Sequence, residues 1–262
     1  MPSITTQHGV VHFEVSGRGR PIIFLHGWLG SWGLWHDTMD FLSHYYRTYA
    51  LDFWGFGESG KKGDSFTVPD FVSLVDQFME SLGIIRAPLV GHSMGGTVSL
   101  SFALQHPEKV SKVVVIGSPI NGSSLALMLK MAGNPYIARL VFNAMWALKF
   151  GIRVASPFIT REPKWVEMME KDLSKTTLES FLLSIASLRK TDLRPKLTPQ
   201  CFPVMGMYGN RDVIVNPNQW AVLQASLPCA RIERFERAGH FIMLDDPQQF
   251  MFKLHDFLEY EY

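Results

Sequence analysis

Apolar and polar positions divide most of the chain into short apolar runs separated by longer amphipathic segments. Several runs are almost continuously apolar, which is typical of strands covered on both faces. The segments between them repeat apolar residues every three to four positions, as helices do. The predicted strands are Val10–Val15, Ile22–Leu25, Tyr49–Leu51, Pro88–Val90, Val113–Ile116, Val204–Tyr208 and Ile232–Phe235, and the predicted helices are Trp35–His44, Val68–Leu82, Met94–Gln105, Pro217–Ser226 and Pro247–Leu258. Their alternation predicts an α/β fold, with a mainly parallel sheet between helices on both faces.

The alternation stops between residues 121 and 194. Helical patterns continue there, broken by the turn sequences GNP, SP and EP, and no strand is predicted. The predicted helices are Leu125–Met131, Ile137–Phe150, Lys164–Asp172 and Thr177–Arg189. An all-helical insertion between two strands of one sheet is typical of a lid. We therefore expect residues 1–120 and 195–262 to form the core and residues 121–194 to form a helical cap.

The composition excludes some classes of protein. With 262 residues, 47% of them hydrophobic, the chain has the composition of a globular protein rather than a disordered one. Its 25 Lys and Arg nearly balance its 24 Asp and Glu, which gives a net charge of +1. No overall field therefore favours a nucleic-acid partner.

The cysteines, the first residues and the apolar stretches indicate the cellular compartment of the protein. Cys201 and Cys229 have no metal-ligand spacing and are too few for a disulfide framework, so we expect buried or idle thiols. The first residues, MPSITTQHGVVHFEV, lack the features of a secretion signal. The long apolar stretch Leu125–Ile152 is interrupted by charged and turn-forming residues and does not predict a membrane-spanning helix. These features predict a cytoplasmic location.

The sequence PLVGHSMGGT at residues 88–97 contains the first candidate for chemistry, Ser93 between Gly91 and Gly95. It follows a predicted strand and precedes a predicted helix, which is the context of a nucleophile elbow. A helix start there also directs free N–H groups at charge developing beside the hydroxyl. Gly-x-Ser-x-Gly alone arises by chance in roughly one chain in ten of this size, so a merely glycine-rich helix start stays open until partners are found.

A serine nucleophile needs a base and an acid that orients the base. Of the nine histidines, His240 lies in a loop after the last predicted strand, in ERAGHFIMLDDP, whereas the others flank motifs or lie in surface-like segments. Asp212 follows the strand Val204–Tyr208 within YGNRDVIV. The order Ser93, Asp212, His240, with each residue after a separate strand, predicts a catalytic triad.

Taken together, these motifs resemble the α/β-hydrolase superfamily over nearly the whole chain. The matching segments are FLHGW at 24–28, LDFWGFGESG at 51–60, VGHSMGG at 90–96, YGNRD at 208–212 and AGH at 238–240. The resemblance implies an eight-stranded sheet with a helical cap. It also implies an oxyanion hole formed by the backbone N–H groups of Trp28 and Met94. The stretch from Asp52 to Ser59 matches a family turn that we interpret as mostly structural.

The resemblance also excludes reactions. Family members that open epoxides or displace halide use an aspartate nucleophile, whereas this chain has Ser93. The sequence contains neither a glycine-rich phosphate loop nor a His/Glu metal cluster, so it indicates no cofactor and no metal. The oligomeric state is not predicted.

The first half of the cap combines apolar and basic residues. Residues 121–161 contain five positive charges and no Asp or Glu; the basic residues are Lys130, Arg139, Lys149, Arg153 and Arg161. One interpretation is a lid whose charges simply face water. The other is an apolar acyl pocket with a basic rim for weak contact with an anionic carrier or membrane surface. The residues predicted to bind substrate are Met128, Phe142, Met145 and Trp146.

Three function classes follow. The first is a carboxylesterase-type serine hydrolase that cleaves esters of small to medium apolar acyl groups through an acyl-enzyme on Ser93. The second is a carbon–carbon bond hydrolase of diketone ring-cleavage products, and the third is a non-catalytic ligand receptor on the same fold. The HGW sequence and the basic apolar cap also resemble esterases that act on carrier-bound methyl esters, which we keep as a substrate hypothesis.

Overall fold

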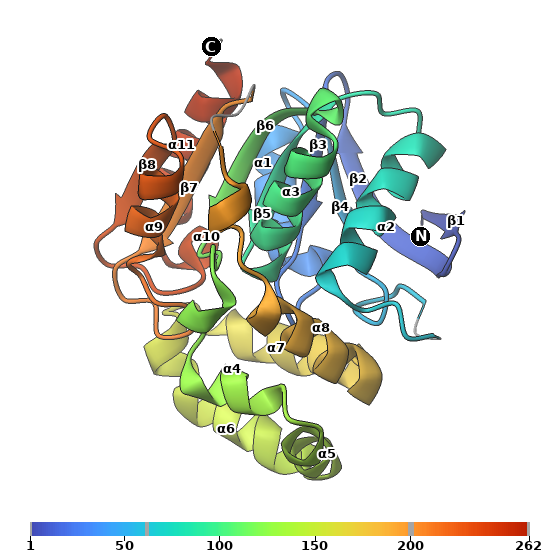
Figure 1. Ribbon diagram of the computed structural model, residues 1–262, viewed down its shortest axis with the longest axis vertical. Coiled ribbons are helices and arrows are strands. Elements are labelled where there is room, and N and C mark those ends of the chain that lie inside the picture. Colours follow the sequence, from blue (N-terminus) through green and yellow to red (C-terminus); the bar gives the residue numbers. More distant parts are fainter. Residues whose placement is uncertain (1, 61–62, 199–201, 261–262) are drawn as a thin grey trace.

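The computed structural model describes residues 2–60, 63–198 and 202–260. Its centre is one eight-stranded sheet with the order β1-β2-β4-β3-β5-β6-β7-β8 (Figure 1). The strands are β1 (Ser3–Thr6), β2 (Gly9–Gly17), β3 (Pro21–Leu25), β4 (Arg47–Leu51), β5 (Ala87–His92), β6 (Val110–Ile116), β7 (Val204–Gly209) and β8 (Arg231–Phe235). Among the strands that the structure describes, only the pairs β1–β2 and β2–β4 are antiparallel. The predicted mainly parallel sheet is confirmed.

Helices cover both faces of the sheet, as the apolar runs predicted. α1 (His36–Leu42), α10 (Ile242–Asp245) and α11 (Pro247–Glu259) contribute to the apolar cluster on one face. α2 (Val68–Ser81), α3 (Met94–Gln105) and α9 (Gln219–Ser226) contribute to the cluster on the other face. Alternate residues of β3 enter the two clusters, because successive side chains of a strand point to opposite faces.

A group of cap helices lies between β6 and β7, at the lower end of the molecule in Figure 1. These helices are α4 (Leu127–Ala132), α5 (Pro135–Asn143), α6 (Met145–Ile159), α7 (Lys164–Lys175) and α8 (Leu178–Lys190). The segments that enter and leave the cap run side by side. The Leu193 N–H donates to the Ile120 carbonyl at 3.0 Å, and the Gly122 N–H donates to the Thr191 carbonyl at 2.8 Å.

The predicted single helix Ile137–Phe150 is wrong in the structure. The chain breaks at Ala144, with φ −105° and ψ 45°, so that α5 ends and α6 begins. The turn predicted at the SP sequence is also wrong, because α6 continues through Pro157 to Ile159. A proline removes one helical hydrogen bond, but α6 keeps its helical course through Pro157. β1 was not predicted because four residues with mixed polarity carry little strand signal.

The cysteines and the apolar stretch of the cap lie as follows in the structure. Cys229 is an exposed free thiol, whereas Cys201 lies outside the described residues. No described helix combines the length and the apolar character that a bilayer crossing requires. The apolar stretch Leu125–Ile152 is divided among α4, α5 and α6.

Candidate active site

Ser93 occupies the corner between β5 and α3. It precedes the first residue of α3, and its backbone has φ 52° and ψ −118°. A positive φ in a residue other than glycine is strained. The Ser93 N–H donates to the Ile116 carbonyl of β6 at 2.8 Å, which holds the corner against the sheet. The side chain is 6% exposed.

The glycines around Ser93 are required because the backbone of neighbouring elements approaches them closely. A Cβ atom at Gly91 would overlap the carbonyl group of Gly95, and one at Gly95 would overlap the Leu25 carbonyl of β3. A Cβ at Gly96 would overlap the Ser118 hydroxyl. The glycine spacing therefore lets β5, the elbow and α3 pack tightly, which a serine on an ordinary helix start would not need.

His240 and Asp212 meet at the same edge of the sheet. Asp212 follows β7, and His240 lies in the loop after β8. His240 Nδ1 lies 2.7 Å from Asp212 Oδ2, and both side chains are buried. The other carboxylate oxygen of Asp212 accepts hydrogen bonds from the N–H groups of Ile214 and Val215, at 2.8 and 2.9 Å. The acid therefore has a fixed orientation, and His240 Nε2 points away from it.

His92 is hydrogen-bonded to the loop that carries His240. Its Nε2 donates to the His240 carbonyl at 3.1 Å, and the two imidazole rings are 4.6 Å apart in an edge-on arrangement. Burial holds the pKa of His92 well below its usual value. The neutral ring of His92 therefore places no positive charge beside His240. Sequence reasoning placed His92 beside the motif but did not identify this contact.

One predicted oxyanion donor belongs to the residue after Ser93, and the other belongs to the loop after Gly27. Met94 is the first residue of α3, so its N–H has no acceptor within the helix. On the other side, a Cβ at Gly27 would lie 3.2 Å from the Cβ of Ser93, which shows how closely the loop before Trp28 approaches the nucleophile. The Trp28 indole N–H donates to the Phe181 carbonyl of α8 at 3.1 Å and ties this loop to the cap.

His26 fixes the same loop to the core. Its Nε2 accepts a hydrogen bond from the Phe53 N–H at 3.0 Å, and its Nδ1 donates to the Gly27 carbonyl at 2.7 Å. Burial lowers the pKa of His26 to about 4, so the ring is neutral at physiological pH. Leu29, two residues after Gly27, has a positive φ of 59°. The loop that carries Trp28 is therefore tightly constrained.

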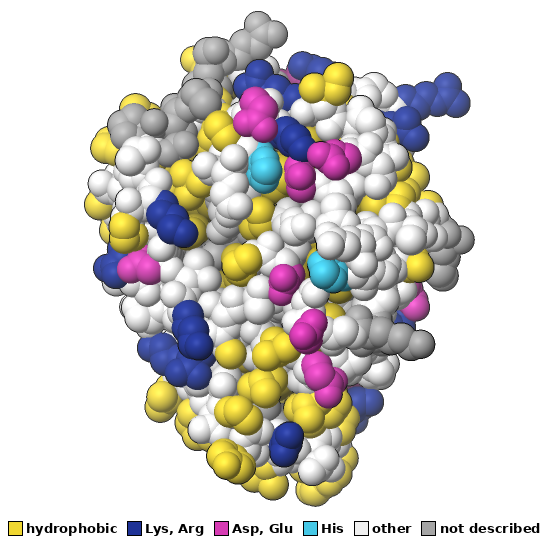
Figure 2. All heavy atoms as spheres, turned by 45° about the vertical axis from the view of Figure 1, so that its right-hand side comes forward, with side chains coloured by type: hydrophobic (Ala, Val, Ile, Leu, Met, Phe, Trp, Pro, Cys, Tyr) yellow, Lys and Arg dark blue, Asp and Glu magenta, His cyan; other side chains and the backbone are white. Residues whose placement is uncertain are grey.

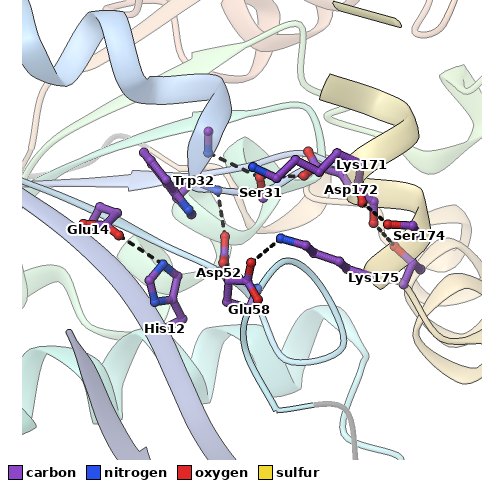
Figure 3. Close-up of polar contacts among 12 residues, drawn as sticks. His12, Glu14, Ser31, Trp32, Asp52, Glu58, Lys171, Asp172, Ser174 and Lys175 are labelled. Carbon is purple, nitrogen blue, oxygen red and sulfur yellow. Dashed lines mark hydrogen bonds and ion pairs between the residues drawn. The ribbon is translucent and has the colours of Figure 1, made fainter. Parts of the chain in front are cut away.

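Two carboxylates hold the following residues of this loop (Figure 3). Asp52, after β4, accepts hydrogen bonds from the N–H groups of Trp32 and Glu58, at 2.7 and 2.9 Å. Asp172, on α7 of the cap, accepts from the Ser31 hydroxyl at 2.8 Å. Burial raises the pKa of Asp52 to about 7 and that of Asp172 to about 6. The contacts of Asp52 suit the structural role we assigned to its turn, whereas sequence reasoning missed Asp172.

A cavity of about 360 Å³ lies between the core and the cap and includes Ser93 and His240 in its wall. Most of the other described residues that line it are aliphatic, aromatic or methionine. They include Leu29, Leu129, Leu148, Ile152, Met168, Met169, Phe181 and Phe241. None of the described lining residues is Lys or Arg, and Asp172 is the one acid among them. The residues described by the structure contain no group of three or more His, Cys, Asp or Glu arranged to hold a metal.

The four cap residues predicted to bind substrate lie in different places. Met128 lines the cavity. Phe142 and Met145 are half-buried and pack against the core cluster, and Trp146 is 76% exposed on the outside of the cap. These three are not among the described residues that line the cavity. Leu148 and Ile152 of α6 line it instead.

The sequence and the fold are similar to those of known proteins. A family model described as alpha/beta hydrolase fold matches residues 20–247. A pimeloyl-[acyl-carrier protein] methyl ester esterase of Nitrosomonas europaea is 27% identical, over 92% of this chain and 96% of the relative. A 2-hydroxy-6-oxo-6-phenylhexa-2,4-dienoate hydrolase of Burkholderia cepacia is 29% identical, over 95% of this chain and 91% of the relative. The crystal structure of an enol-lactonase from Burkholderia xenovorans LB400 superposes with a TM-score of 0.88 at 21% identity, covering 99% of this chain and all of that one.

Proposed function

Since the chain belongs to the alpha/beta hydrolase fold family, we propose that it is a serine hydrolase that cleaves carboxylic esters. The observation that carries the proposal is one arrangement at the edge of the sheet. Ser93 lies on a strained corner at the start of α3, and His240, which is hydrogen-bonded to Asp212, lines the same cavity as Ser93. Family membership alone would not select a function, because one fold supports many.

The proposed reaction uses this arrangement in two halves. The Ser93 oxygen bonds to the ester carbonyl carbon while its proton passes to Nε2 of His240. The carbonyl oxygen becomes an oxyanion, which the N–H groups of Trp28 and Met94 stabilise. The intermediate then expels the alcohol, which takes the proton from His240. Water repeats the sequence on the acyl-enzyme and releases the acid.

The cavity supports small to medium uncharged substrates. A volume of about 360 Å³ and a mostly apolar wall suit a modest acyl group. A buried anion would need a cationic partner, and no Lys or Arg lies among the described lining residues. The carbon–carbon alternative, favoured by the similarity to a dienoate hydrolase, would bring such an anion. We therefore place ester cleavage first.

A panel of substrates tests whether the protein cleaves esters in preference to carbon–carbon bonds. We expect p-nitrophenyl esters of short and medium acyl groups to be turned over, with a maximum in the acyl-length series set by the cavity. A diketone carboxylate from ring cleavage should react at least 100-fold more slowly in kcat/KM. Faster cleavage of the diketone would establish the carbon–carbon alternative. Turnover of neither substrate, with no covalent labelling, would leave a non-catalytic receptor.

The predicted contact with an anionic carrier or membrane surface concerns the outer cap face. By this name we mean the exposed apolar side chains of α4, α5 and α6. Its members are Leu127, Met128, Met131, Tyr136, Leu140, Trp146, Phe150, Val154 and Phe158. Figure 2 shows hydrophobic side chains gathered at the lower end of the molecule, where Figure 1 shows these helices. On α6 the exposed residues recur every four positions, which forms a continuous stripe. Large exposed apolar surfaces of this kind mark interaction sites.

We propose that the outer cap face rests on an anionic bilayer surface. Residues 121–161 carry basic but no acidic side chains, which complements anionic headgroups. Arg153 is engaged with Glu170, so the hypothesis depends mainly on the other basic residues. Met128 and Met131 belong to this face and also line the cavity. A substrate dissolved in the bilayer could therefore enter beside them, whereas an acidic carrier protein would need fewer large apolar side chains.

Vesicle binding tests the bilayer hypothesis. We expect Trp146→Ser to weaken binding to phosphatidylglycerol-containing vesicles by about ten-fold, because one large apolar side chain no longer inserts. Arg139→Glu should weaken binding at low salt and lose its effect at high salt. The matched controls are Phe252→Ser, which changes a 71% exposed aromatic residue of α11, and Arg18→Glu, in an exposed core loop. Equal binding by all four variants would contradict the hypothesis, and a dimer that dissociates in Trp146→Ser would identify a second copy as the occupant.

A further inference from the structure

The loop that carries His240 continues into the short helix α10. This helix begins at Ile242 and ends at Asp245, so it follows His240 almost directly. The Asp245 side chain reaches back to Gly239, whose N–H donates to Asp245 Oδ2 at 2.7 Å. Gly239 is the residue immediately before His240. A hydrogen bond from a backbone N–H to a carboxylate is stronger than one between uncharged groups, so this contact fixes the backbone beside the proposed base.

The other carboxylate oxygen of Asp245 holds the end of the cap helix α6. Asp245 Oδ1 accepts hydrogen bonds from the Thr160 hydroxyl and the Arg161 N–H, both at 2.7 Å. Thr160 follows the last residue of α6 and is buried. The two oxygens of one carboxylate therefore serve the cap on one side and the loop of His240 on the other. Removing the carboxylate would leave these three donors without this acceptor, and unpaired donors are costly where they are buried.

A close backbone contact accompanies these hydrogen bonds. A Cβ atom at Gly239 would lie 2.5 Å from the carbonyl oxygen of Ile159, so glycine is needed for the two backbones to approach so closely. Ile159 is the last residue of α6 and also lines the cavity. On the core side, the His240 carbonyl accepts from His92 Nε2 at 3.1 Å. The loop of His240 is therefore held between the core and the cap, and Asp245 joins it to the cap by hydrogen bonds.

We propose that Asp245 is a positioning residue, which holds His240 in place for proton transfer and sets its position relative to the cap. Asp212 orients the imidazole ring through Nδ1, but the place of the ring also depends on the backbone that carries it. Proton transfer requires the base to lie within hydrogen-bond reach of the Ser93 hydroxyl. Asp245 is not among the described residues that line the cavity, so it acts through Gly239 rather than on the substrate. The inference rests on the proposed function, in which His240 is the base.

The first test removes the carboxylate and measures the chemistry. We expect Asp245→Ala to lower the single-turnover rate of p-nitrophenyl ester cleavage by about 10- to 100-fold, because His240 is no longer held in reach of Ser93. The substrate concentration that gives half of the maximal rate should change by less than about three-fold, since no contact with the substrate is removed. Asp245→Asn keeps one acceptor oxygen and should lose less of the rate. A rate in Asp245→Ala within about two-fold of the wild-type rate would overturn the inference.

The neighbouring residue Asp246 provides the matched control. Its side chain accepts a hydrogen bond from the Gln249 N–H at the start of α11, at 3.4 Å. Asp246→Ala should therefore lower the melting temperature through the lost helix cap and leave the single-turnover rate within about two-fold. An equal loss of rate in both alanine variants would mean general destabilisation and would overturn the positioning role. A loss in Asp245→Ala as large as that in His240→Ala would also overturn it, because Asp245 would then be the orienting acid.

Hydrogen exchange tests the link between the cap and the loop of His240 without any turnover. In Asp245→Ala, the backbone N–H groups of residues 236–241 and 157–163 should exchange about ten-fold faster, because the carboxylate protects both segments. Thr160→Val removes the hydroxyl that donates from the cap and should accelerate exchange in both segments to a smaller extent. Asp246→Ala should accelerate exchange in α11 and leave both segments unchanged.

The two kinds of measurement separate the positioning role from the proposed chemistry. If the wild-type protein cleaves no ester while both segments respond in Asp245→Ala, the proposed function fails and the link to the cap stands. If esters are cleaved but residues 236–241 exchange as in the wild-type protein, the inference fails and the proposed function stands. If Asp245→Ala does not fold, Asp245→Asn and Thr160→Val are measured in its place, and wild-type rates and exchange in both would overturn the inference.

Discussion

Replacing Ser93 with alanine is expected to abolish covalent modification by a fluorophosphonate probe and to lower kcat by on the order of 10⁵-fold or more. Ser93 is the one group proposed to bond to the substrate, so no neighbouring side chain can substitute for it. In the wild-type protein, mass spectrometry should find one adduct per chain, on the peptide that contains Ser93. The protein should remain folded, because alanine still fits beside the glycines of the elbow.

A second serine of α3 provides the control for this substitution. Ser101 is buried, and its hydroxyl donates to the Thr97 carbonyl within the helix. Ser101→Ala should therefore keep both the labelling and the turnover of the wild-type protein. An adduct on any serine other than Ser93, or undiminished turnover in Ser93→Ala, would exclude the elbow as the nucleophile.

Loss of His240 or Asp212 should have the next largest effect, and the two losses should not add. We expect His240→Ala to lower kcat by on the order of 10³-fold or more, because no base remains to take the Ser93 proton. Asp212→Asn should be somewhat milder. Once His240 is absent, removing Asp212 as well should change kcat little, since the two act as one unit with Ser93. Single-turnover kinetics of the two variants and the double variant give the comparison.

The nearby carboxylate Asp245 is the alternative acid, and the structure explains why it ranks second. Its Oδ1 accepts hydrogen bonds from the Thr160 hydroxyl and the Arg161 N–H, both at 2.7 Å. Its Oδ2 accepts from the Gly239 N–H, also at 2.7 Å. Asp245 therefore joins the loop of His240 to the end of α6. If Asp212→Asn is close to wild type, the acid lies elsewhere, and Asp245→Asn and Asp246→Asn should then be compared.

The core of the fold is predictable from sequence because its signals are local. Continuous apolar runs mark strands buried on both faces, and the seven predicted strands correspond to β2 through β8. The residues of the candidate site follow strand ends, and parallel strands bring those ends to one edge of the sheet. The order of Ser93, Asp212 and His240 therefore predicts their proximity without any knowledge of long-range contacts.

The cap could not be predicted in the same detail. Its first half is apolar on nearly every side, so periodicity did not indicate which face of α6 would turn inward. The break at Ala144 has no proline or glycine to mark it, and it sends Trp146 outward while Leu148 faces the cavity. Asp172 was missed for a different reason: its significance comes from burial and from the Ser31 contact, which only the tertiary structure reveals.

The segments that enter and leave the cap are adjacent, which affects how freely the length and sequence of the cap could change. Backbone hydrogen bonds join Ile120 to Leu193 and Gly122 to Thr191. The two ends of the cap segment therefore lie next to each other. Closing a loop between two such points costs free energy that grows only slowly with loop length. Evolution, or an engineer, could therefore lengthen, shorten or exchange the segment without displacing the strands that carry Ser93, Asp212 and His240. Under the proposed function, exchanging this segment would change the substrate preference and leave the proposed catalytic residues in place.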